Sequence, residues 1–346
     1  IRDYILNVIS VNPGHLGSSL GAIELTVAIH YVFDTPNDNI VWDVGHQTYA
    51  HKILTGRKKQ FSTIRKFGGI SGFPKTSESK YDDFGTGHAS TSISAALGMA
   101  MAAYHQGNTK QSHIAFIGDG SIGGGMAFEA MNNAGASKAN LLIILNDNGI
   151  SIDKSVGGLK DYLLRMSTSK QYNNFRDRVW RMFSKNSEGP NKKFVLRQIK
   201  SNLKSSILDE GNLFEALGLR YFGPTDGHNV IELVEILSKL KNLNGPRILH
   251  CITVKGKGYS KAEDDQVRFH APGVFDLSTG EPCSVPNANQ TPKYQEVFGK
   301  TLIKLADKNE KIVGITPAIP TGSSLCLMMD KYPDRVYDVG ICEEHA

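Results

Sequence analysis

The sequence has little of what marks secreted or membrane-spanning proteins. Only four of its 346 residues are cysteines, none in a Cys-x-x-Cys pair, and only two are tryptophans. No apolar run approaches the roughly eighteen residues of a transmembrane helix. These absences exclude a disulfide-stapled secreted domain and argue against a helical membrane protein. They favour a chain with reduced thiols, expected in the cytoplasm.

Glycine, by contrast, is abundant. The 35 glycines are near one residue in ten, against a usual share of about 7%. Many occur in short runs, such as residues 118–125 and 256–258. Hydrophobic residues make up 40% of the chain and charged residues 21%, which is enough apolar mass for a packed core. The glycine runs therefore indicate places in a globular fold where backbone approaches a ligand or another segment closely.

Apolar runs separated by glycine-rich turns predict alternating strands and helices. We expect strands at residues 39–43, 113–117, 140–145, 246–253 and 311–316. We expect helices at residues 23–29, 90–104 and 126–136. The strand–helix–strand unit over residues 113–145 is typical of a parallel sheet flanked by helices. The predicted fold class is therefore α/β.

A basic stretch interrupts this pattern. Residues 160–210 hold twelve basic and five acidic side chains, a balance of +7, whereas the whole chain carries +5. Apolar residues at four-residue spacing over 195–207 predict an amphipathic helix there. We interpret residues 155–210 as a solvated basic helical insertion, with a cover over an anionic ligand as the alternative. No nucleic-acid-binding module accompanies the stretch, so nucleic acid is not expected as a partner.

The composition changes again near residue 276. Residues 276–292 are rich in proline, serine and asparagine and lack periodicity, which predicts a linker. We place one large domain at residues 1–285 and the beginning of a second α/β domain at residues 286–346. Because the sequence stops just after a strand-like stretch, we expect it to be part of a longer polypeptide.

The glycine loop at residues 118–123, Gly-Asp-Gly-Ser-Ile-Gly, fits two kinds of site. It matches the dinucleotide pattern G-x-G-x-x-G between a strand and a helix, which would predict an NAD-dependent oxidoreductase. Asp119 argues against that interpretation, because its carboxylate repels a pyrophosphate unless a cation lies between them. The loop therefore favours a diphosphate bound through a metal ion.

A second residue supports the metal. Asn148 follows the next predicted strand, and the carboxyl ends of parallel strands meet at one edge of a sheet. An Asp carboxylate, an Asn amide oxygen, a backbone carbonyl near Ile150 and phosphate oxygens are the hard ligands that Mg²⁺ prefers. Alternatively, Asp119 caps the following helix and Asn148 closes a turn. The occurrence of both residues at strand ends favours Mg²⁺.

These residues resemble a known motif. Gly118-Asp119-Gly120 followed by Asn148 is similar to the diphosphate-anchoring motif of thiamine-diphosphate enzymes. More narrowly, segments along nearly the whole chain resemble the 1-deoxy-D-xylulose-5-phosphate synthase family. They are residues 14–21, 42–57, 85–92, 223–228, 255–259, 269–271 and 338–343. The resemblance implies the thiamine-diphosphate-binding fold, with residues 1–285 as its diphosphate domain and the rest beginning its pyrimidine domain.

The resemblance also implies roles for individual residues. It implies Mg²⁺ binding by Asp119, Asn148 and Ile150. It implies thiamine diphosphate binding by His46, Gly87, His88, Ala89, Gly120, Ser121, Asn148, Tyr259 and Glu343. It implies catalysis by Glu343, His15 and His270. Two positions depart from the family: Ala89 stands where a serine is frequent, and Glu344 where many relatives have glutamine, so the register of Glu343 depends on the alignment.

The reaction implied is the decarboxylative condensation of pyruvate with glyceraldehyde 3-phosphate, giving 1-deoxy-D-xylulose 5-phosphate and CO₂. This transferase reaction feeds isoprenoid, thiamine and pyridoxal biosynthesis, and family members are homodimers of the bacterial cytoplasm, plastid or apicoplast. Family residues that grip the aldehyde's phosphate would lie beyond residue 346, so we expect this chain alone to lack full activity. The alternatives are the NAD-dependent oxidoreductase and a non-catalytic fragment that keeps the fold.

Overall fold

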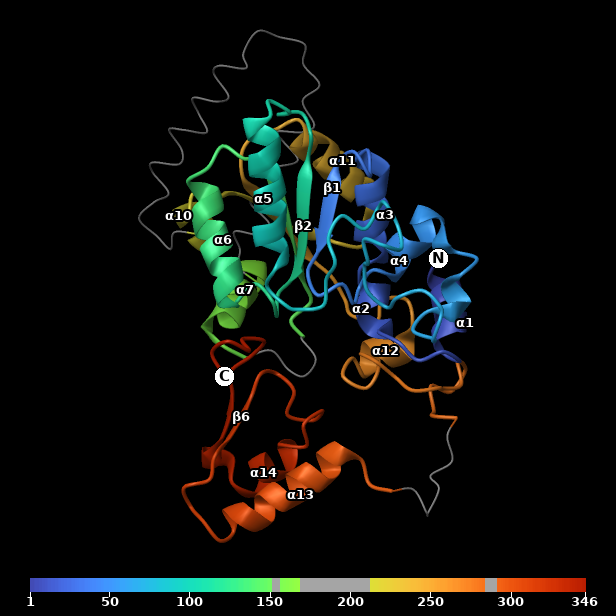
Figure 1. Ribbon diagram of the computed structural model, residues 1–346, viewed down its shortest axis with the longest axis vertical. Helices are drawn as coiled ribbons and strands as arrows, with labels where there is room; N and C mark the ends of the chain where they lie inside the picture. Colours follow the sequence, from blue (N-terminus) through green and yellow to red (C-terminus); the bar gives the residue numbers. More distant parts are fainter. Residues whose placement is uncertain (151–155, 169–211, 284–290) are drawn as a thin grey trace.

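A parallel β-sheet forms the centre of the molecule (Figure 1). The computed structural model describes residues 1–150, 156–168, 212–283 and 291–346. Five strands lie in the order β1-β2-β3-β5-β4 and all neighbours are parallel. The strands are β1 (Asn39–Trp42), β2 (His113–Gly118), β3 (Leu141–Asp147), β4 (Arg220–Asp226) and β5 (Arg247–Ile252). The predicted α/β class is confirmed.

Helices cover both faces of this sheet, as its two-sided apolar strands require. One face packs against α5 (Ser92–His105), α6 (Gly125–Gly135), α7 (Gly158–Thr168) and α10 (Leu213–Ala216). The other face packs against α3 (Ile23–Val32) and α11 (Val230–Lys241). Successive residues of β2 alternate between the faces: Ile114 and Phe116 join the α3–α11 core, and Ala115 and Ile117 the α5–α6 core.

A third core lies beside the sheet. It is built by short helical segments and by Phe269 and Phe275, which follow them in the chain. The segments are α1 (Arg2–Ile9), α2 (Leu16–Gly21), α4 (Tyr49–Lys52), the π-helix η1 (Ile53–Arg57), the 3₁₀ turn η2 (Phe61–Thr63) and α12 (Ser260–Asp264). This core joins the first sixty residues to residues 255–280, and both segments contribute to the site described below.

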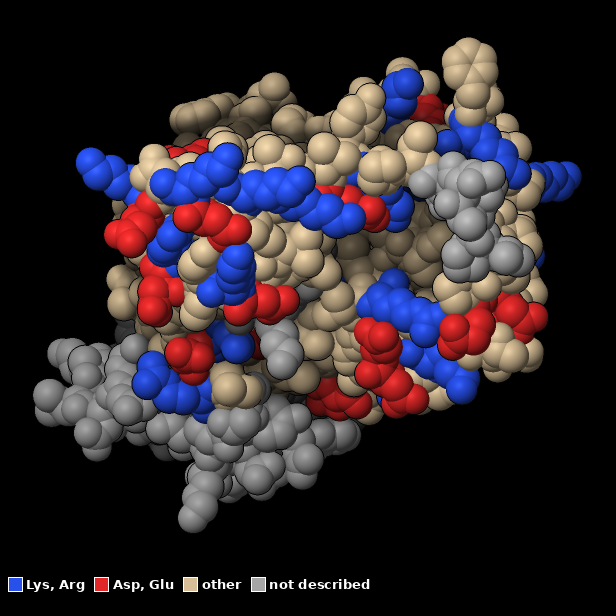
Figure 2. Space-filling view, turned by 90° about the horizontal axis from the view of Figure 1, so that it is seen from below, with Lys and Arg blue, Asp and Glu red and all other residues tan. Residues whose placement is uncertain are grey.

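The residues after 290 form a small lobe with its own core, drawn in red in Figure 1. Its two strands are parallel, and its two helices pack against each other and, through the second helix, against a 3₁₀ turn. The elements are α13 (Tyr294–Ala306), β6 (Gly314–Thr316), α14 (Cys326–Lys331), η3 (Pro333–Arg335) and β7 (Val336–Asp338). On the face seen in Figure 2, basic and acidic side chains intermingle.

One sheet strand has no counterpart in the sequence prediction. β4 contains Gly223-Pro224, and proline within an apolar run argues against a strand because it cannot donate to the ladder. β4 lies at the edge of the sheet, and its pairing with β5 shifts register between Phe222 and Thr225. An edge position and an irregular register accommodate the proline.

The remaining predicted elements occur within a few residues of their expected bounds, although the strand expected at 311–316 is shortened to β6. Of the basic stretch, the structure describes residues 160–168, which lie within α7. The amphipathic helix predicted at 195–207 lies outside the described residues. Among the described residues, no helix is long and apolar enough to cross a membrane.

Candidate active site at the carboxyl ends of the strands

Asp119 and Asn148 lie together where two neighbouring strands end. β2 and β3 pair with Gly118 opposite Asn146, and the Asp119 amide donates to the Asn146 carbonyl at 3.2 Å. The Asp119 carboxylate in turn accepts a hydrogen bond from the backbone N–H of Asn148. The structure therefore brings together the two side chains that the strand pattern placed at one edge of the sheet.

The electrostatics of Asp119 are unusual for an aspartate. Burial, followed by the nearby negative charge of Asp147, raises the pKa of Asp119 to about 7. Asp147 Oδ2 accepts a 2.8 Å hydrogen bond from His250 Nε2, and His250 Nδ1 lies 2.8 Å from the Tyr221 hydroxyl. Two carboxyl groups are thus held close together in a poorly solvated place, an arrangement that a cation stabilises.

The turn after β3 is fixed by its own side chains. Asn148 Oδ1 accepts from the Ile150 amide at 3.2 Å, and Asp147 Oδ1 accepts from the Gly149 amide at 3.2 Å. Asn148 thus closes a turn, and its amide oxygen keeps a second lone pair for a ligand. No cluster of three or more His, Cys, Asp or Glu side chains suited to a metal occurs in the part of the chain that the structure describes. A metal here would need oxygen ligands from a bound phosphate.

Three histidines from three separate segments meet beside this edge. The ring centroids of His15 and His270 are 5.4 Å apart, those of His15 and His46 5.8 Å, and those of His46 and His270 5.9 Å. Phe73 packs edge-on against His15 with centroids 5.5 Å apart. His15 and His270 were predicted to be catalytic and His46 to bind cofactor, and the structure places all three in one cluster.

All three imidazoles are neutral at pH 7. Burial lowers the pKa of His15 to about 4 and that of His270 to about 3, and it holds the pKa of His46 well below its usual value. The positive charge of Lys255 adds to this effect at each ring, and that of Arg65 at His15. Two cations next to neutral rings make the cluster attractive to an anion.

Close packing of α2 places His15 in this cluster. A Cβ on Gly21 would lie 3.0 Å from the Val254 carbonyl oxygen and 3.3 Å from Lys255 Cα, so a larger residue would press on this backbone. The Gly17 amide donates to the Phe269 carbonyl at 2.9 Å. The His15 amide donates to the buried Tyr49 hydroxyl at 2.9 Å, which fixes the start of the helix.

The segment with Gly87, His88 and Ala89 is anchored by a buried aspartate. Asp43, directly after β1, accepts hydrogen bonds from the amides of Ser90 and Ser92 at 2.9 and 3.0 Å. Ser90 adopts a positive φ of 68°, and its hydroxyl donates to the Ser121 carbonyl at 2.7 Å. These bonds connect the predicted cofactor-binding segment to the Asp119 loop.

The last residues of the chain approach the same edge. Cys342 Sγ lies 3.7 Å from the Gly123 carbonyl oxygen, and Glu344 Oε1 lies 4.0 Å from His88 Nε2. The hydrogen bond of His88 to the Ala89 carbonyl and the charges of Glu343 and Glu344 raise the pKa of His88. Glu343 is exposed on this approaching segment.

Tyr259 and Ser121 are placed less directly. The Tyr259 hydroxyl donates to the Leu277 carbonyl at 3.0 Å, and its ring packs against Phe269. The Ser121 amide donates to the Gly118 carbonyl at 3.1 Å within the loop. The cofactor contacts predicted for both residues stay predictions.

Sequence reasoning gave no role to Lys255 or Asp43. Lys255 is only 1% exposed, and its charge influences the three histidines and Asp119. Asp43 comes directly after β1, as Asp119 comes after β2, and Lys255 lies three residues after the end of β5. A charged residue near the carboxyl end of a predicted buried strand is the sequence pattern that could have identified Asp43 and Lys255 as site residues.

Comparison with known proteins agrees with this geometry. The family described as 1-deoxy-D-xylulose-5-phosphate synthase matches residues 1–253. The chain belongs to this family. Synthases of the family from Cytophaga hutchinsonii and Porphyromonas gingivalis are 59% and 56% identical to it over 348 residues. All of this chain is covered in both comparisons, and 55% of each relative. The chain therefore spans about half the length of the curated relatives it matches.

Solved structures show the same fold at low identity. Transketolase from Campylobacter jejuni superposes with a TM-score of 0.55 at 18% identity, covering 98% of this chain and 60% of that one. Transketolase from Leishmania mexicana gives a TM-score of 0.53 at 19% identity, covering 75% of this chain and 36% of that one. These neighbours share the parallel sheet flanked by helices. Membership of the synthase family does not favour the NAD-dependent alternative.

Proposed function

We propose that this chain carries the diphosphate side of a thiamine-diphosphate site in a transferase that condenses pyruvate with glyceraldehyde 3-phosphate to 1-deoxy-D-xylulose 5-phosphate and CO₂. One observation carries the proposal: the histidine cluster and the Asp119–Asn148 pair lie at the same edge of the sheet. The charge of Lys255 acts on the pKa of both Asp119 and His270. Family membership at more than half identity supports it.

The residues present fit both implied groups. Burial and the negative charge of Asp147 raise the pKa of Asp119, so a divalent cation would relieve a repulsion already built into the fold. Mg²⁺ would be held by the Asp119 carboxylate, the Asn148 amide oxygen and the Ile150 carbonyl. His46 Nδ1 is buried without a hydrogen-bond partner among the described residues, as suits a ring that faces a polar ligand.

The cofactor would lie along the edge from the Asp119 loop to the histidine cluster. We assign its binding to His46, Gly87, His88, Ala89, Gly120, Ser121, Asn148, Tyr259 and Glu343. When bound, thiamine diphosphate supplies a carbon nucleophile and an electron sink. The Ser90–Ser121 hydrogen bond holds two of these segments at a fixed separation, so the site is preorganised.

The chain's own residues would bind the substrate anions and move protons. His15 and His270 are neutral, so each ring can donate a proton at one nitrogen and accept one at the other. Lys255 and Arg65 would attract the carboxylate of pyruvate. Binding an anion beside His15 would raise the pKa of that ring toward neutrality, where proton transfer is efficient. We assign catalysis to His15, His270 and Glu343.

Three further assignments belong to this proposal. We place the boundary between the diphosphate domain and the next domain within residues 276–292, because separate cores lie on either side. We expect the protein to act as a homodimer, as the family resemblance implies. Its bacterial relatives support a cytoplasmic location.

Thermal melting tests the proposal. Thiamine diphosphate together with Mg²⁺ should raise the Tm of the chain, and either one alone should raise it less, because a ligand stabilises only the state that binds it. Asp119→Ala should abolish the shift. A shift with NAD that needs no metal would overturn the proposal. Activity itself is tested on the chain extended to the length of its relatives, in which His15→Ala should lower kcat.

A further inference from the structure

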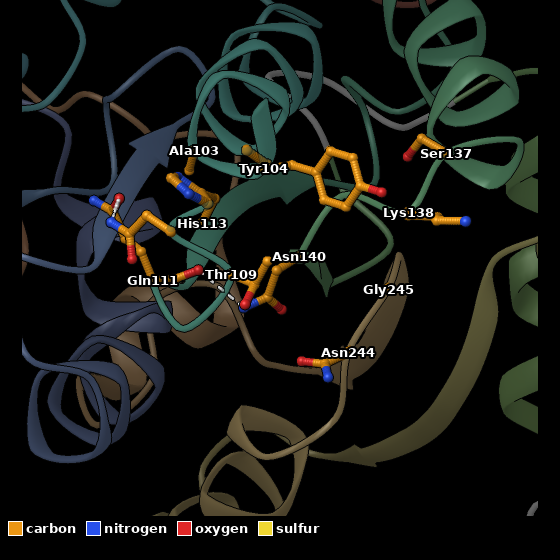
Figure 3. A pocket seen from close by; sticks show the side chains of 12 residues that line it. Ala103, Tyr104, Thr109, Gln111, His113, Ser137, Lys138, Asn140, Asn244 and Gly245 are labelled. Atoms are coloured by element: carbon orange, nitrogen blue, oxygen red, sulfur yellow. Dashed lines mark hydrogen bonds between the residues drawn. The ribbon is translucent and has the colours of Figure 1, made fainter. Parts of the chain in front are cut away.

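A second pocket lies at the opposite edge of the sheet, where the strands begin. Its volume is about 460 Å³, within the usual range for small-molecule sites. It is bordered by the end of α5, the loop after α6 and the residues just before β2, β3 and β5. Figure 3 shows Tyr104, Lys138, Asn140 and Asn244 around the central space. The family site described above does not include this edge.

A buried cation without a carboxylate lies next to this pocket. Arg247 is fully buried, and its Nη1 donates to Asn140 Oδ1 and to the Gly245 carbonyl, both at 2.8 Å. Its Nε and Nη2 are buried without hydrogen-bond partners, and no ion pair of Arg247 occurs among the described residues. A guanidinium removed from water and left without a counter-ion is costly, so its retention indicates a missing negative charge.

More positive charge surrounds the same place. Arg220 donates through Nη2 to the Asn244 carbonyl at the pocket rim. Burial of Arg247 and, second, the charge of Arg220 lower the pKa of Arg247 to about 10. Arg247 therefore stays charged at neutral pH. Lys138 is an exposed lining residue. None of the described residues that line the pocket is an aspartate or glutamate. Asp38, whose charge acts on the lining residue His113, is paired with Lys241 at 3.2 Å, so the charge that the lining residues themselves carry is positive.

Capping of helix ends does not account for these cations. α5 and α6 end at the pocket, and basic side chains commonly neutralise such carbonyl-rich ends. Here the last carbonyls of α5 accept bonds from the amides of Gly107 and Asn108, at 3.1 and 2.9 Å. The Ala134 carbonyl of α6 accepts from both the amide and the hydroxyl of Ser137. The helix ends are satisfied locally, and the cations remain available.

A buried histidine gives a second, independent indication. His113 lines the pocket, is only 2% exposed, and neither ring nitrogen has a hydrogen-bond partner in the described part of the chain. Buried imidazole nitrogens without partners are uncommon in native structures, where such groups are nearly always bonded to protein, water or ligand. Both unsatisfied groups, His113 and Arg247, lie where strands begin at this one edge.

We propose that this pocket binds the phosphate group of a small phosphomonoester. Lys138 and the hydroxyl groups of Tyr104 and Thr109 would donate to the phosphate oxygens, with the charges of Arg247 and Arg220 behind them. The apolar part of the lining, Ala100 and Ala103 with the Tyr104 ring, would cover the organic part of the ligand. The inference does not depend on the thiamine-diphosphate proposal, because it uses residues at the other edge of the sheet.

Isothermal titration calorimetry on the 346-residue chain tests this. The probes are inorganic phosphate and glycerol 3-phosphate, titrated at constant ionic strength set with potassium chloride. Lys138→Glu should weaken binding of both at least about tenfold, since a hydrogen bond to a charged group is lost and a repulsion is introduced. Tyr104→Phe keeps the ring and should weaken binding roughly threefold. Tighter binding of glycerol 3-phosphate than of phosphate would show that the apolar lining contributes.

Matched controls keep the result specific. Lys59→Glu makes the same charge change at an exposed position away from the pocket and should leave the affinity unchanged. Arg247→Met should remove most of the binding. If that variant does not fold, the comparison of Lys138→Glu with Lys59→Glu decides. The proposal would be overturned if neither probe gave heat. It would also be overturned if wild type, Lys138→Glu and Lys59→Glu bound with equal affinity, because the anion would then bind elsewhere.

Discussion

Asp147 raises the pKa of Asp119 from the end of the neighbouring strand, and the positive charge of Lys255 offsets this effect only in part. The hydrogen bond from His250 at 2.8 Å keeps Asp147 in this position. A site built in this way binds a proton or a metal ion in preference to staying empty of both. Cation binding and pH are therefore coupled here.

The first prediction concerns that coupling. Because the Asp119 carboxyl group, with a pKa of about 7, must lose its proton to bind a divalent ion, the affinity for Mn²⁺ should rise about tenfold between pH 6 and pH 8. The loss of the free-ion electron paramagnetic resonance signal measures it without cofactor. Asp147→Asn should lower the pKa of Asp119 and flatten the dependence. Equal affinity at both pH values in the wild type would contradict the prediction.

The second prediction concerns acid stability. The pKa of His15 is about 4 when folded and about 6.5 when unfolded, so between these values the unfolded chain binds more protons. This contribution to stability is present above pH 6.5 and is lost as the pH falls toward 4. The free energy of unfolding, measured in urea, should therefore fall from pH 7.5 to pH 5 in the wild type. In His15→Asn the fall should be smaller by about 1–2 kcal/mol. Parallel losses in both proteins would show that His15 titrates normally.

The third prediction concerns a buried ion network beside the site. Asp82, which has no exposed side-chain surface, accepts two hydrogen bonds from Arg57 at 2.7 and 2.9 Å and one from His51 Nε2 at 2.9 Å. Asp82→Asn would remove the carboxylate that Arg57 contacts through both Nη atoms, and would leave Arg57 and Lys52 to share the charge of Glu78. Unfolding in urea should show a loss of about 3–5 kcal/mol.

An exposed ion pair is the control for that variant. Lys331 Nζ lies 2.7 Å from Asp307 Oδ1 on the surface of the small lobe. Asp307→Asn makes the same chemical change, but solvent screens the pair, so the urea midpoint should stay unchanged. Equal destabilisation by the two variants would mean that burial does not set the strength of the network.

The fourth prediction uses two glycines. A Cβ at Gly98, within α5, meets nothing within 4 Å, so Gly98→Ala should raise the free energy of unfolding by about 0.5–1 kcal/mol through the higher helix propensity of alanine. At Gly21 the added methyl group presses on the backbone of Val254 and Lys255. Gly21→Ala should therefore lower the Tm and weaken cofactor binding. Stabilisation by both substitutions would show that α2 can move away.

Much of this site could be predicted from the sequence because its residues follow strongly apolar strands. The runs before Asp119 and Asn148 are unbroken, so their strands and the edge where they meet follow from the parallel arrangement. His15, His46 and His270 came from family resemblance, because residues so far apart in the chain give no local signal that they meet.

Other features depend on packing that a linear pattern does not contain. Lys255 resembles a solvated loop lysine in the sequence, but in the fold it is buried and α2 packs against it. β4 escaped prediction because the edge of the sheet tolerates Pro224, and the sequence alone does not reveal which strand lies at an edge. The pocket where the strands begin combines residues from four stretches of the chain, 100–104, 108–113, 137–140 and 244–245, none of which forms a motif.

The bonds of Gly17 have a consequence for how the protein is made. Its amide donates to the Phe269 carbonyl, and its carbonyl accepts from the Gly256 amide, so segments about 240–250 residues apart in the chain are joined. Contacts between such distant residues close a long loop, and the entropy lost in closing it slows folding. On the ribosome, His15 is synthesised 255 residues before His270 and meets this partner only after residue 270 has emerged. A nascent chain therefore carries no assembled histidine cluster until the domain is almost complete.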